Sequence, residues 1–271
     1  MQRIYQRTML LAVLVFSIAF ISHAQKTTPV KNIQLKVMTF NTHHCNPPGD
    51  AQLIDVNGVA NAIKRAAPDL VALQEIDVNV KRSGNIDEAA QIAARAGFKY
   101  YYFAKTLDLE GGQYGIAILS KFPLSGTATH QLPSIESLKG EPRVLATAVV
   151  HLPGGKKLTF ASTHLDAYHK ENRLLQIKEI NQIAAGLNMP FIIGGDFNAH
   201  EQSEVIKTLD QQMTRTCENC PPTFDEGDAS GAIDYVAYRP ASKFKVLSQK
   251  VLNTVKASDH FPVMAVLQLH F

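Results

Sequence analysis

The sequence contains little cysteine, and its three cysteines do not form the ligand set of a zinc site. Cys217 and Cys220 stand close together, but no second pair lies near them. A structural zinc site takes four cysteine or histidine ligands. In an oxidising compartment, the pair suits a short disulfide loop instead. Cys45 is left over, and we expect a buried or idle thiol there rather than a catalytic one.

A strong excess of positive charge is also missing. The chain has 27 basic and 24 acidic residues, a formal charge of +3. Without the first 24 residues, which include Arg3 and Arg7, 25 basic residues face the same 24 acids, a formal charge of about +1. Proteins that bind duplex DNA without sequence preference usually carry a basic excess that displaces counterions. The near-neutral charge therefore disfavours DNA as the substrate.

The apolar segment at the N-terminus is shorter than the ~20 residues that a transmembrane helix needs. It runs from Met9 to Ile21, follows two arginines, and is followed by small residues ending at Ala24. These are the parts of a secretory signal peptide. We expect cleavage after residue 24, export to the periplasm or the medium, and no stable membrane span. An uncleaved membrane anchor is the alternative.

Residues 25–271 show no repeat and no long linker, which favours one domain. Apolar patterns predict helices over 55–66, 86–96 and 168–187, with Asp55 as the N-cap of the first. They predict strands over 33–41, 70–75, 100–104, 114–120, 143–151, 157–164, 191–196, 233–238, 244–251 and 261–269. Because several strands follow one another without helices, we expect an α/β domain with antiparallel pairs.

Polar side chains recur at the ends of the apolar strands, and just before the last strand, which is where α/β proteins place their chemistry. They are Asn41, Glu75, His164 with Asp166, Asp196 with Asn198, Asp234, and Asp259 with His260. Gly194 and Gly195 precede Asp196 and leave room for a close backbone approach. On extended backbone, Asp196 and Asn198 would point to the same side. An Asx-turn that closes the strand is the alternative.

The carboxylates among these residues would repel one another in a shared cleft. At roughly 4 Å and an effective dielectric near 20, one pair costs about 4 kcal/mol. A hard cation such as Mg²⁺ or Mn²⁺ relieves this repulsion, whereas zinc would need more histidine or cysteine ligands. His164 and His260 suit a phosphoryl oxygen whose charge grows during transfer. Because neighbours on extended chain point apart, Asp234 or another carboxylate from across the site is favoured over Asp259 for orienting His260.

The motifs resemble, in order and spacing, those of the endonuclease/exonuclease/phosphatase superfamily, the deoxyribonuclease-I-like hydrolases. They are Thr39–Asn41, Leu73–Glu75, Thr163–Asp166, Gly195–Asn198, Ile233–Tyr235 and Ser258–His260. The resemblance extends over about residues 33–269. It implies a four-layer α/β (α+β) sandwich, with two mixed β-sheets face to face, helices outside and the active site at one end of the sheets.

The resemblance also implies roles for individual residues. Glu75 is similar to the principal metal ligand of the family, with Asn41 and Asp259 completing or bridging the metal site. Asp196 resembles the residue that orients or deprotonates the attacking water, and Asn198 its phosphate-contacting neighbour.

For the remaining positions, the resemblance makes Asp234 the partner of His260, which would bind the scissile phosphate. His164 matches a second phosphate-side histidine of the phosphatase and lipid-diesterase branches, where many nucleases have tyrosine. His43 stands where some nucleases carry an acidic residue, which puts a second metal ligand in question.

Together, these features predict an exported, monomeric, Mg²⁺- or Mn²⁺-dependent hydrolase. It would cleave a small, sugar-linked or lipid-linked phosphoester by in-line attack of water. An extracellular nuclease acting on DNA or RNA is the second hypothesis, and a non-catalytic binding protein is the third. Arg143 is expected at the surface, with contact to a non-bridging phosphate oxygen as the alternative. Tyr114 is expected at the substrate mouth or in the core, and Tyr168, His169 and Arg173 at solvated helix positions.

Overall fold

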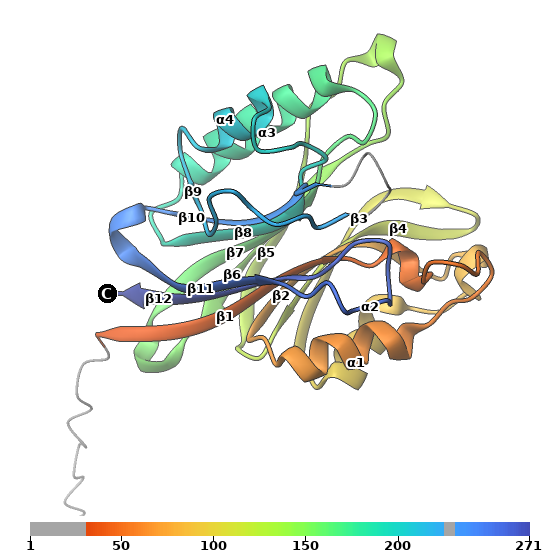
Figure 1. Cartoon of the computed structure of the whole chain (residues 1–271), viewed down its shortest axis with the longest axis horizontal. Coiled ribbons are helices and arrows are strands. Elements are labelled where there is room, and N and C mark those ends of the chain that lie inside the picture. The colour runs from red at the N-terminus through yellow and green to blue at the C-terminus, as the bar shows by residue number, and fades with distance from the viewer. Residues whose placement is uncertain (1–30, 225–230) are drawn as a thin grey trace, which may run out of the picture.

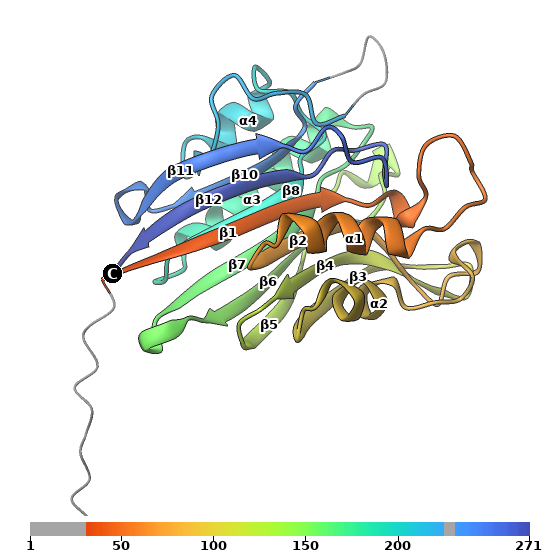
Figure 2. The same cartoon turned by 60° about the horizontal axis from the view of Figure 1, so that its bottom comes forward.

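The computed structural model describes residues 31–224 and 231–271. Residues 1–24, the predicted signal peptide, lie outside the described residues. Figures 1 and 2 show two β-sheets face to face, with α1 and α2 against the outer surface of one sheet and α3 and α4 against the other. The predicted four-layer sandwich with two mixed sheets is confirmed.

The first sheet has six strands in the order β11-β12-β1-β2-β4-β3. Its strands are β1 (Asn32–Asn41), β2 (Leu70–Val78), β3 (Tyr100–Leu109), β4 (Gly112–Ser120), β11 (Phe244–Val251) and β12 (Val263–His270). Within it, β1 and β2 are parallel and the other neighbours are antiparallel.

The second sheet also has six strands, in the order β5-β6-β7-β8-β10-β9. Its strands are β5 (Leu124–Gln131), β6 (Val144–His151), β7 (Lys157–His164), β8 (Phe191–Asp196), β9 (Thr214–Arg215) and β10 (Asp234–Arg239). Here β7 and β8 form the parallel pair.

The helices begin and end at residues with suitable caps. Their bounds are α1 (Val56–Ala66), α2 (Glu88–Ala96), α3 (Lys170–Ala185) and α4 (Glu204–Leu209). Asp55 caps α1 as predicted, since its Oδ1 accepts a hydrogen bond from Gly58 N at 2.8 Å. Short 3₁₀ turns are η1 (His43–Cys45), η2 (Lys81–Ser83), η3 (Glu136–Leu138), η4 (Pro153–Gly155) and η6 (Ala241–Lys243). Among the described residues, the helices are too short or too polar to cross a bilayer.

Apolar side chains fill the three spaces between the four layers. The cluster between the sheets includes Leu35, Leu70, Ile118, Phe160 and Ile192. The cluster under α1 and α2 includes Phe40, Ile63 and Ile92, and the one under α3 and α4 includes Ile177, Phe191 and Tyr235. Such burial contributes about 25 cal/mol per Å² of apolar surface, so it fixes the layers around the site.

Three elements were not predicted: β5, α4 and the two-residue strand β9. None of them has a strong apolar pattern. Strand β5 lies at the edge of its sheet, and several of its side chains are exposed. Helix α4 has only six residues, and such a short segment shows no helical periodicity in the sequence. The predicted helix over 168–187 is shorter in the structure, because α3 begins at Lys170.

The parallel pairs bring their C-terminal ends to the same end of the sandwich. Asn41 of β1 donates to Asp196 of β8, and Gln74 of β2 donates to Ser162 of β7, so the pairs are joined across the two sheets. A Cβ atom on Gly194 would lie 3.0 Å from Thr39 Cβ, which explains glycine at this close approach.

Candidate active site

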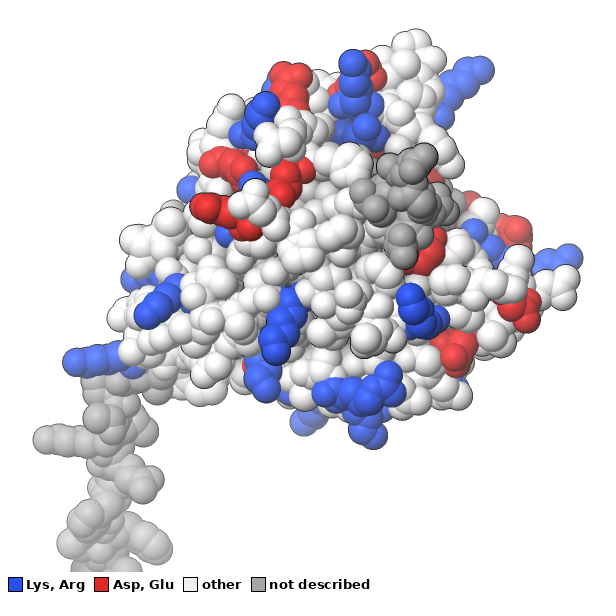
Figure 3. Space-filling model, viewed as in Figure 1, with Lys and Arg blue, Asp and Glu red and all other residues white. Residues whose placement is uncertain are grey.

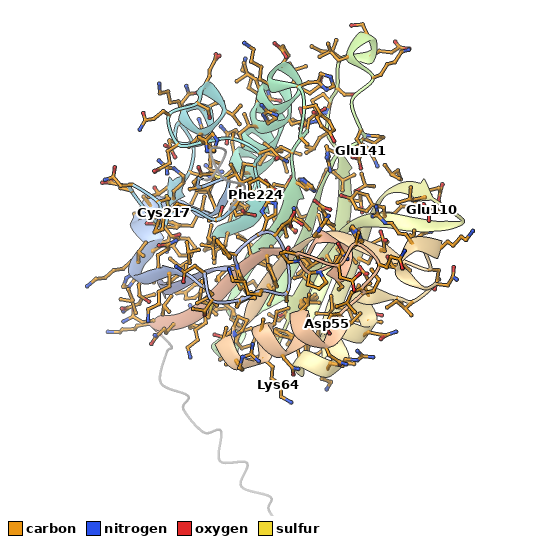
Figure 4. All side chains as sticks on the ribbon, turned by 45° about the vertical axis from the view of Figure 1, so that its right-hand side comes forward. Asp55, Lys64, Glu110, Glu141, Cys217 and Phe224 are labelled. Carbon is orange, nitrogen blue, oxygen red and sulfur yellow. A yellow bond between two sulfur atoms is a disulfide. The ribbon has the colours of Figure 1, made fainter. Side chains whose placement is uncertain are left out.

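A pocket of about 460 Å³ opens at this end of the sandwich. Loops and strand ends of both sheets line it; Figure 4 labels two of the lining residues, Glu141 and Phe224, and Glu110 beyond them. The lining also includes most of the predicted site residues: Glu75, His164, Asp196, Asn198, Asp259 and His260. Asn41 and Asp234 lie behind it and hydrogen-bond to lining residues.

Asp196 lies at the floor of the pocket and is almost fully buried. Its Oδ2 accepts a hydrogen bond from Asn41 Nδ2 at 3.0 Å, and its Oδ1 accepts one from Asn198 N at 2.8 Å. Burial, with the negative charge of Asp234, raises the pKa of Asp196 to about 7. A carboxylate with a pKa near neutrality is suited to accept a proton from water.

The prediction that Asp196 and Asn198 point to the same side requires extended backbone through Asn198. In the structure, Asn198 leaves the extended conformation of β8. Its φ is +48°, and its backbone N–H bonds back to Asp196, which is the Asx-turn alternative. The turn nevertheless leaves Asn198 in the pocket lining, where its Nδ2 donates to Leu165 O at 3.1 Å. The turn and the site role are therefore compatible.

His260 is held by Asp234, as predicted. The two side chains approach at 2.9 Å between Nδ1 and Oδ2, and Thr223 Oγ1 donates to the same Oδ2 at 2.7 Å. Burial alone would lower the pKa of His260, but the charges of Asp234 and Asp196 outweigh it and raise the pKa to about 10. The ring is therefore an imidazolium at neutral pH.

Asp234 begins a strand rather than ending one. Strand β10 starts at Asp234, runs antiparallel to β8, and pairs Asp234 with Asp196. The first residue of an antiparallel partner reaches the same edge as the last residue of its neighbour. Asp234 therefore lies in the site although its strand runs in the opposite direction.

His164 faces Asp196 from the end of β7. Its Nδ1 lies 3.2 Å from Arg143 Nη1 and its Nε2 lies 3.4 Å from Asp196 Oδ2. Burial, followed by the charge of Arg143, holds the pKa of His164 well below its ordinary value. Because a guanidinium only donates, Nδ1 must accept, and the neutral ring carries its hydrogen on Nε2. His164 thus presents an N–H donor next to Asp196.

Arg143 is not at the surface, and that prediction was wrong. Its side chain is 4% exposed, lines the pocket, and lies 3.3 Å from Glu141 Oε2 through Nη2. Its Nε has no hydrogen-bond partner among the described residues. The buried Tyr114 also lines the pocket, so it belongs both to the core and to the substrate mouth.

Glu75 occupies an irregular position inside β2 rather than the end of the strand. Its φ is +55°, and the pairing of β2 with β4 shifts register between Leu73 and Ile76. Such a bulge redirects a side chain. Glu75 Oε1 accepts a hydrogen bond from Asn41 Nδ2 at 3.0 Å, while Asn41 Oδ1 accepts one from His43 N. In this orientation, Asn41 positions Glu75 and Asp196.

Asp259 lies at the rim of the pocket, next to His43. Their closest side-chain atoms, His43 Nδ1 and Asp259 Oδ2, are 3.8 Å apart. Ser258 fixes this loop, because its Oγ donates to Asn41 O at 2.8 Å. The loop before β12 is thereby tied to the end of β1, which brings Asp259 and His260 to the site.

Some residues of the sequence motifs have structural roles. Asp166 accepts hydrogen bonds from the backbone N–H groups of Tyr168 and His169 and from Asn172 Nδ2, which holds the start of α3. Tyr168 is 83% exposed and lines the pocket rim, so it is solvated but not remote from the site. Arg173 donates to the backbone oxygen of Asp166.

A sequence model of the Endonuclease/Exonuclease/phosphatase family matches residues 38–260. The chain belongs to this family. Its named activities all hydrolyse phosphoester bonds, which agrees with a site of two histidines around a buried carboxylate. Nocturnin from Xenopus laevis is 32% identical over 155 residues. That match covers 52% of this chain and 38% of the frog protein, so the similarity extends over well under half of that relative.

Solved structures share the fold. A family member from Beutenbergia cavernae aligns with a TM-score of 0.75 at 24% identity, covering 88% of this chain and 72% of that one. The mannosyl-6-phosphatase of Bacteroides thetaiotaomicron aligns with a TM-score of 0.70 at 18% identity, and the alignment covers 86% of this chain and 99% of that one. The human Nocturnin catalytic domain with bound sulfate aligns with a TM-score of 0.67 at 21% identity, and the alignment covers 86% of this chain and 94% of that one.

Proposed function

We propose that the protein is an exported, metal-dependent hydrolase that cleaves a small sugar-linked or lipid-linked phosphoester. One observation carries this proposal: the Nε2 atoms of His164 and His260 approach the same oxygen of Asp196, at 3.4 and 3.7 Å, at the floor of an open pocket. Two N–H donors beside a proton acceptor suit hydrolysis at phosphorus, because the donors can stabilise the growing charge and the acceptor can take the proton of water.

In the proposed reaction, water forms a new bond to phosphorus and the ester P–O bond breaks on the opposite side. Asp196 orients the water and accepts its proton, because its pKa is near neutrality. His164 and His260 donate from Nε2 to the phosphoryl oxygens, whose negative charge grows in the transition state. Asp234 and Thr223 keep the ring of His260 in the orientation that this requires.

Glu75 and Asp259 fit a divalent cation. Both line the pocket, and Glu75 forms no salt bridge with any residue within 31–224 or 231–271. A half-buried carboxylate whose one hydrogen-bond partner there is an amide has oxygen available for a metal. When bound, the cation would supply positive charge against the phosphoryl group during transfer.

The size of the pocket supports a small substrate. Its volume lies within the ~300–1,000 Å³ of pockets for small molecules. Leu107, Leu109 and Tyr168 add apolar surface to the lining, which suits the carbon skeleton of a leaving group.

The charges around the pocket do not favour a polyanion. The arginines of the lining are paired: Arg82 Nε lies 2.8 Å from Asp77, and Arg143 contacts Glu141. On the face in Figure 3, basic side chains lie at the lower edge and elsewhere alternate with acidic ones. A nucleic acid would need a more continuous basic track.

Export remains part of the proposal. It is supported by the signal-peptide features of residues 1–24 and by the disulfide between Cys217 and Cys220, since disulfides persist in oxidising compartments. Cell fractionation with an antibody to the protein would test it, and recovery of the unprocessed chain in the cytoplasm would contradict it.

The substrate class is tested by hydrolysis assays on purified residues 25–271, each with Mg²⁺, Mn²⁺ or EDTA. The panel contains p-nitrophenyl phosphate, bis-p-nitrophenyl phosphate, mannose 6-phosphate, a choline phospholipid and plasmid DNA. Sugar phosphate is included because one structural relative is named a mannosyl-6-phosphatase. We expect metal-dependent cleavage of a small or lipid ester with DNA left intact. Nicking of DNA without cleavage of the small esters would overturn the proposal.

A further inference from the structure

Two neighbouring histidines lie against the proposed metal ligand Glu75. His43, His44 and Glu75 each offer a ligand atom, and these atoms all lie within 4.8 Å of one another. The histidine rings meet edge to face, with centroids 4.6 Å apart. Asp259 Oδ2 lies 3.8 Å from His43 Nδ1, at the edge of this group of three.

The hydrogen bonds of His43 leave one ring nitrogen free to bind a metal. Its Nδ1 lies 3.3 Å from the backbone oxygen of Asn46, which can only accept. Nδ1 therefore carries the hydrogen, and Nε2 keeps its lone pair in the neutral ring. A histidine that binds a metal usually donates its other N–H to a carbonyl or carboxylate in this manner.

His44 contains a buried polar atom that the protein does not satisfy. Its Nδ1 is inaccessible to solvent and has no hydrogen-bond partner among the described residues. A buried polar atom without a partner costs about 1–3 kcal/mol, so its retention calls for an explanation. Some change in the ring's orientation or a ligand at the ring would remove this cost.

The backbone that presents the two rings is strained. His43, His44 and Cys45 have φ values of +47°, +42° and +57°, a region that L-residues rarely adopt. The turn is held by hydrogen bonds from Cys45 N to Thr42 O and from Asp55 N to Cys45 O. Strain of this kind, of order 1–3 kcal/mol per residue, tends to occur at functional sites.

From this arrangement we propose that His43 and His44 join Glu75 in binding the divalent cation. Imidazole ligands favour transition metals, Zn²⁺ and Fe²⁺ more than Mn²⁺, whereas Mg²⁺ prefers oxygen and water. The enzyme is thus a transition-metal hydrolase rather than a magnesium hydrolase. These two rings are histidine ligands of the kind that zinc would need. The inference rests on the proposed cation site but not on the identity of the substrate.

Pulsed electron paramagnetic resonance of the Mn²⁺ complex tests the ligands directly, without substrate. The protein is used without a histidine tag, after removal of metal with EDTA. We expect ¹⁴N coupling from imidazole in the wild type, and its loss in the double variant His43→Gln/His44→Gln. His151→Gln is the matched control, because His151 lies at the far end of β6 and bonds to Ser125. A wild-type spectrum with no nitrogen coupling would overturn the inference.

Titration calorimetry gives a second readout. We expect Mn²⁺ and Zn²⁺ to bind at least tenfold more tightly than Mg²⁺, and His44→Gln to weaken Zn²⁺ binding by about 10- to 100-fold while Mg²⁺ binding stays within about threefold. Equal losses for both metals, at an unchanged melting temperature, would contradict a nitrogen ligand. Nitrogen coupling in a protein that cleaves no ester would refute the proposed function while leaving this inference standing.

Discussion

The Nδ1 atom of His260 lies 2.9 Å from Oδ2 of Asp234, and both side chains are buried. The carboxylate is paired from the other side by Thr223 Oγ1. The imidazolium is therefore stabilised far above the pH at which a free histidine loses its charge. This pair sets the protonation state of the group that we expect to bind the phosphoryl oxygen.

Replacing Asp234 by asparagine should remove that stabilisation. The pKa of His260 would fall from about 10 towards 6.5, so the imidazolium would be lost as pH rises through neutrality instead of above pH 9. We expect kcat at pH 8 to fall by about 10²- to 10⁴-fold. In a plot of kcat against pH from 5.5 to 10, the alkaline limb should also shift to lower pH than in the wild type. A variant whose limb stays in place would show that Asp234 does not tune His260.

A separate pH effect should appear in stability, through Glu88. This side chain is fully buried, and burial raises its pKa from 4.5 to about 8. Between these two pH values the folded protein holds a proton that the unfolded chain has released, so the free energy of unfolding falls as pH rises. Glu88→Gln removes this titration and can still accept the hydrogen bond from Asp77 N.

As pH rises from 5 to 8, the free energy of unfolding of Glu88→Gln should increase relative to that of the wild type, by on the order of a few kcal/mol. Urea unfolding in EDTA at both pH values measures the difference. The exposed Glu136→Gln is the control and should show no such gain. An identical pH dependence in Glu88→Gln and wild type would mean that Glu88 is ionised in the folded protein.

Activity should depend on the whole guanidinium group of Arg143, because two of its nitrogens contact Glu141 and His164. A lysine keeps the charge but cannot form this forked arrangement. We expect Arg143→Lys to lower kcat/KM by about 10- to 100-fold through misplacement of His164. Arg95→Lys, on the exposed face of α2, is the control and should keep normal rates. Normal kcat/KM in Arg143→Lys would exclude the arginine from the site.

The disulfide between Cys217 and Cys220 closes a very short loop. In the chain-entropy description, such a loop contributes only about 2 kcal/mol. The double variant Cys217→Ser/Cys220→Ser should therefore unfold at lower urea, by about that amount, and keep its activity. Thermal unfolding with and without reductant gives the same comparison in the wild type. A melting temperature that does not respond to reductant would contradict the assignment of the bond.

Much of the fold was predictable, because the apolar strands and the caps are local signals. Strand β8 with Asp196, and helix α1 with its cap Asp55, lie where the pattern places them. The family motifs then supplied the layers. Strand β5 was not predictable, since its partly exposed edge position leaves it mostly polar.

The site was less predictable where the position of a residue depends on contacts with residues that are distant in the sequence. Arg143 looks like a surface residue in the sequence, and only contacts with His164 from β7 and with Glu141 keep it buried. The proximity of His44 to Glu75 depends on left-handed backbone that no composition rule signals. Likewise, Asn198 leaves the extended conformation because its backbone bonds to the Asp196 side chain.

The most direct test of the account is the turnover of Asp196→Asn on whichever ester the substrate panel identifies, with Mn²⁺ and with EDTA. We predict metal-dependent turnover in the wild type and a loss of at least about 100-fold in the variant, because the amide cannot accept a proton from water. Mn²⁺ affinity and the circular dichroism spectrum should stay close to wild type. A correctly folded Asp196→Asn protein that turns over at the wild-type rate would contradict the central claim.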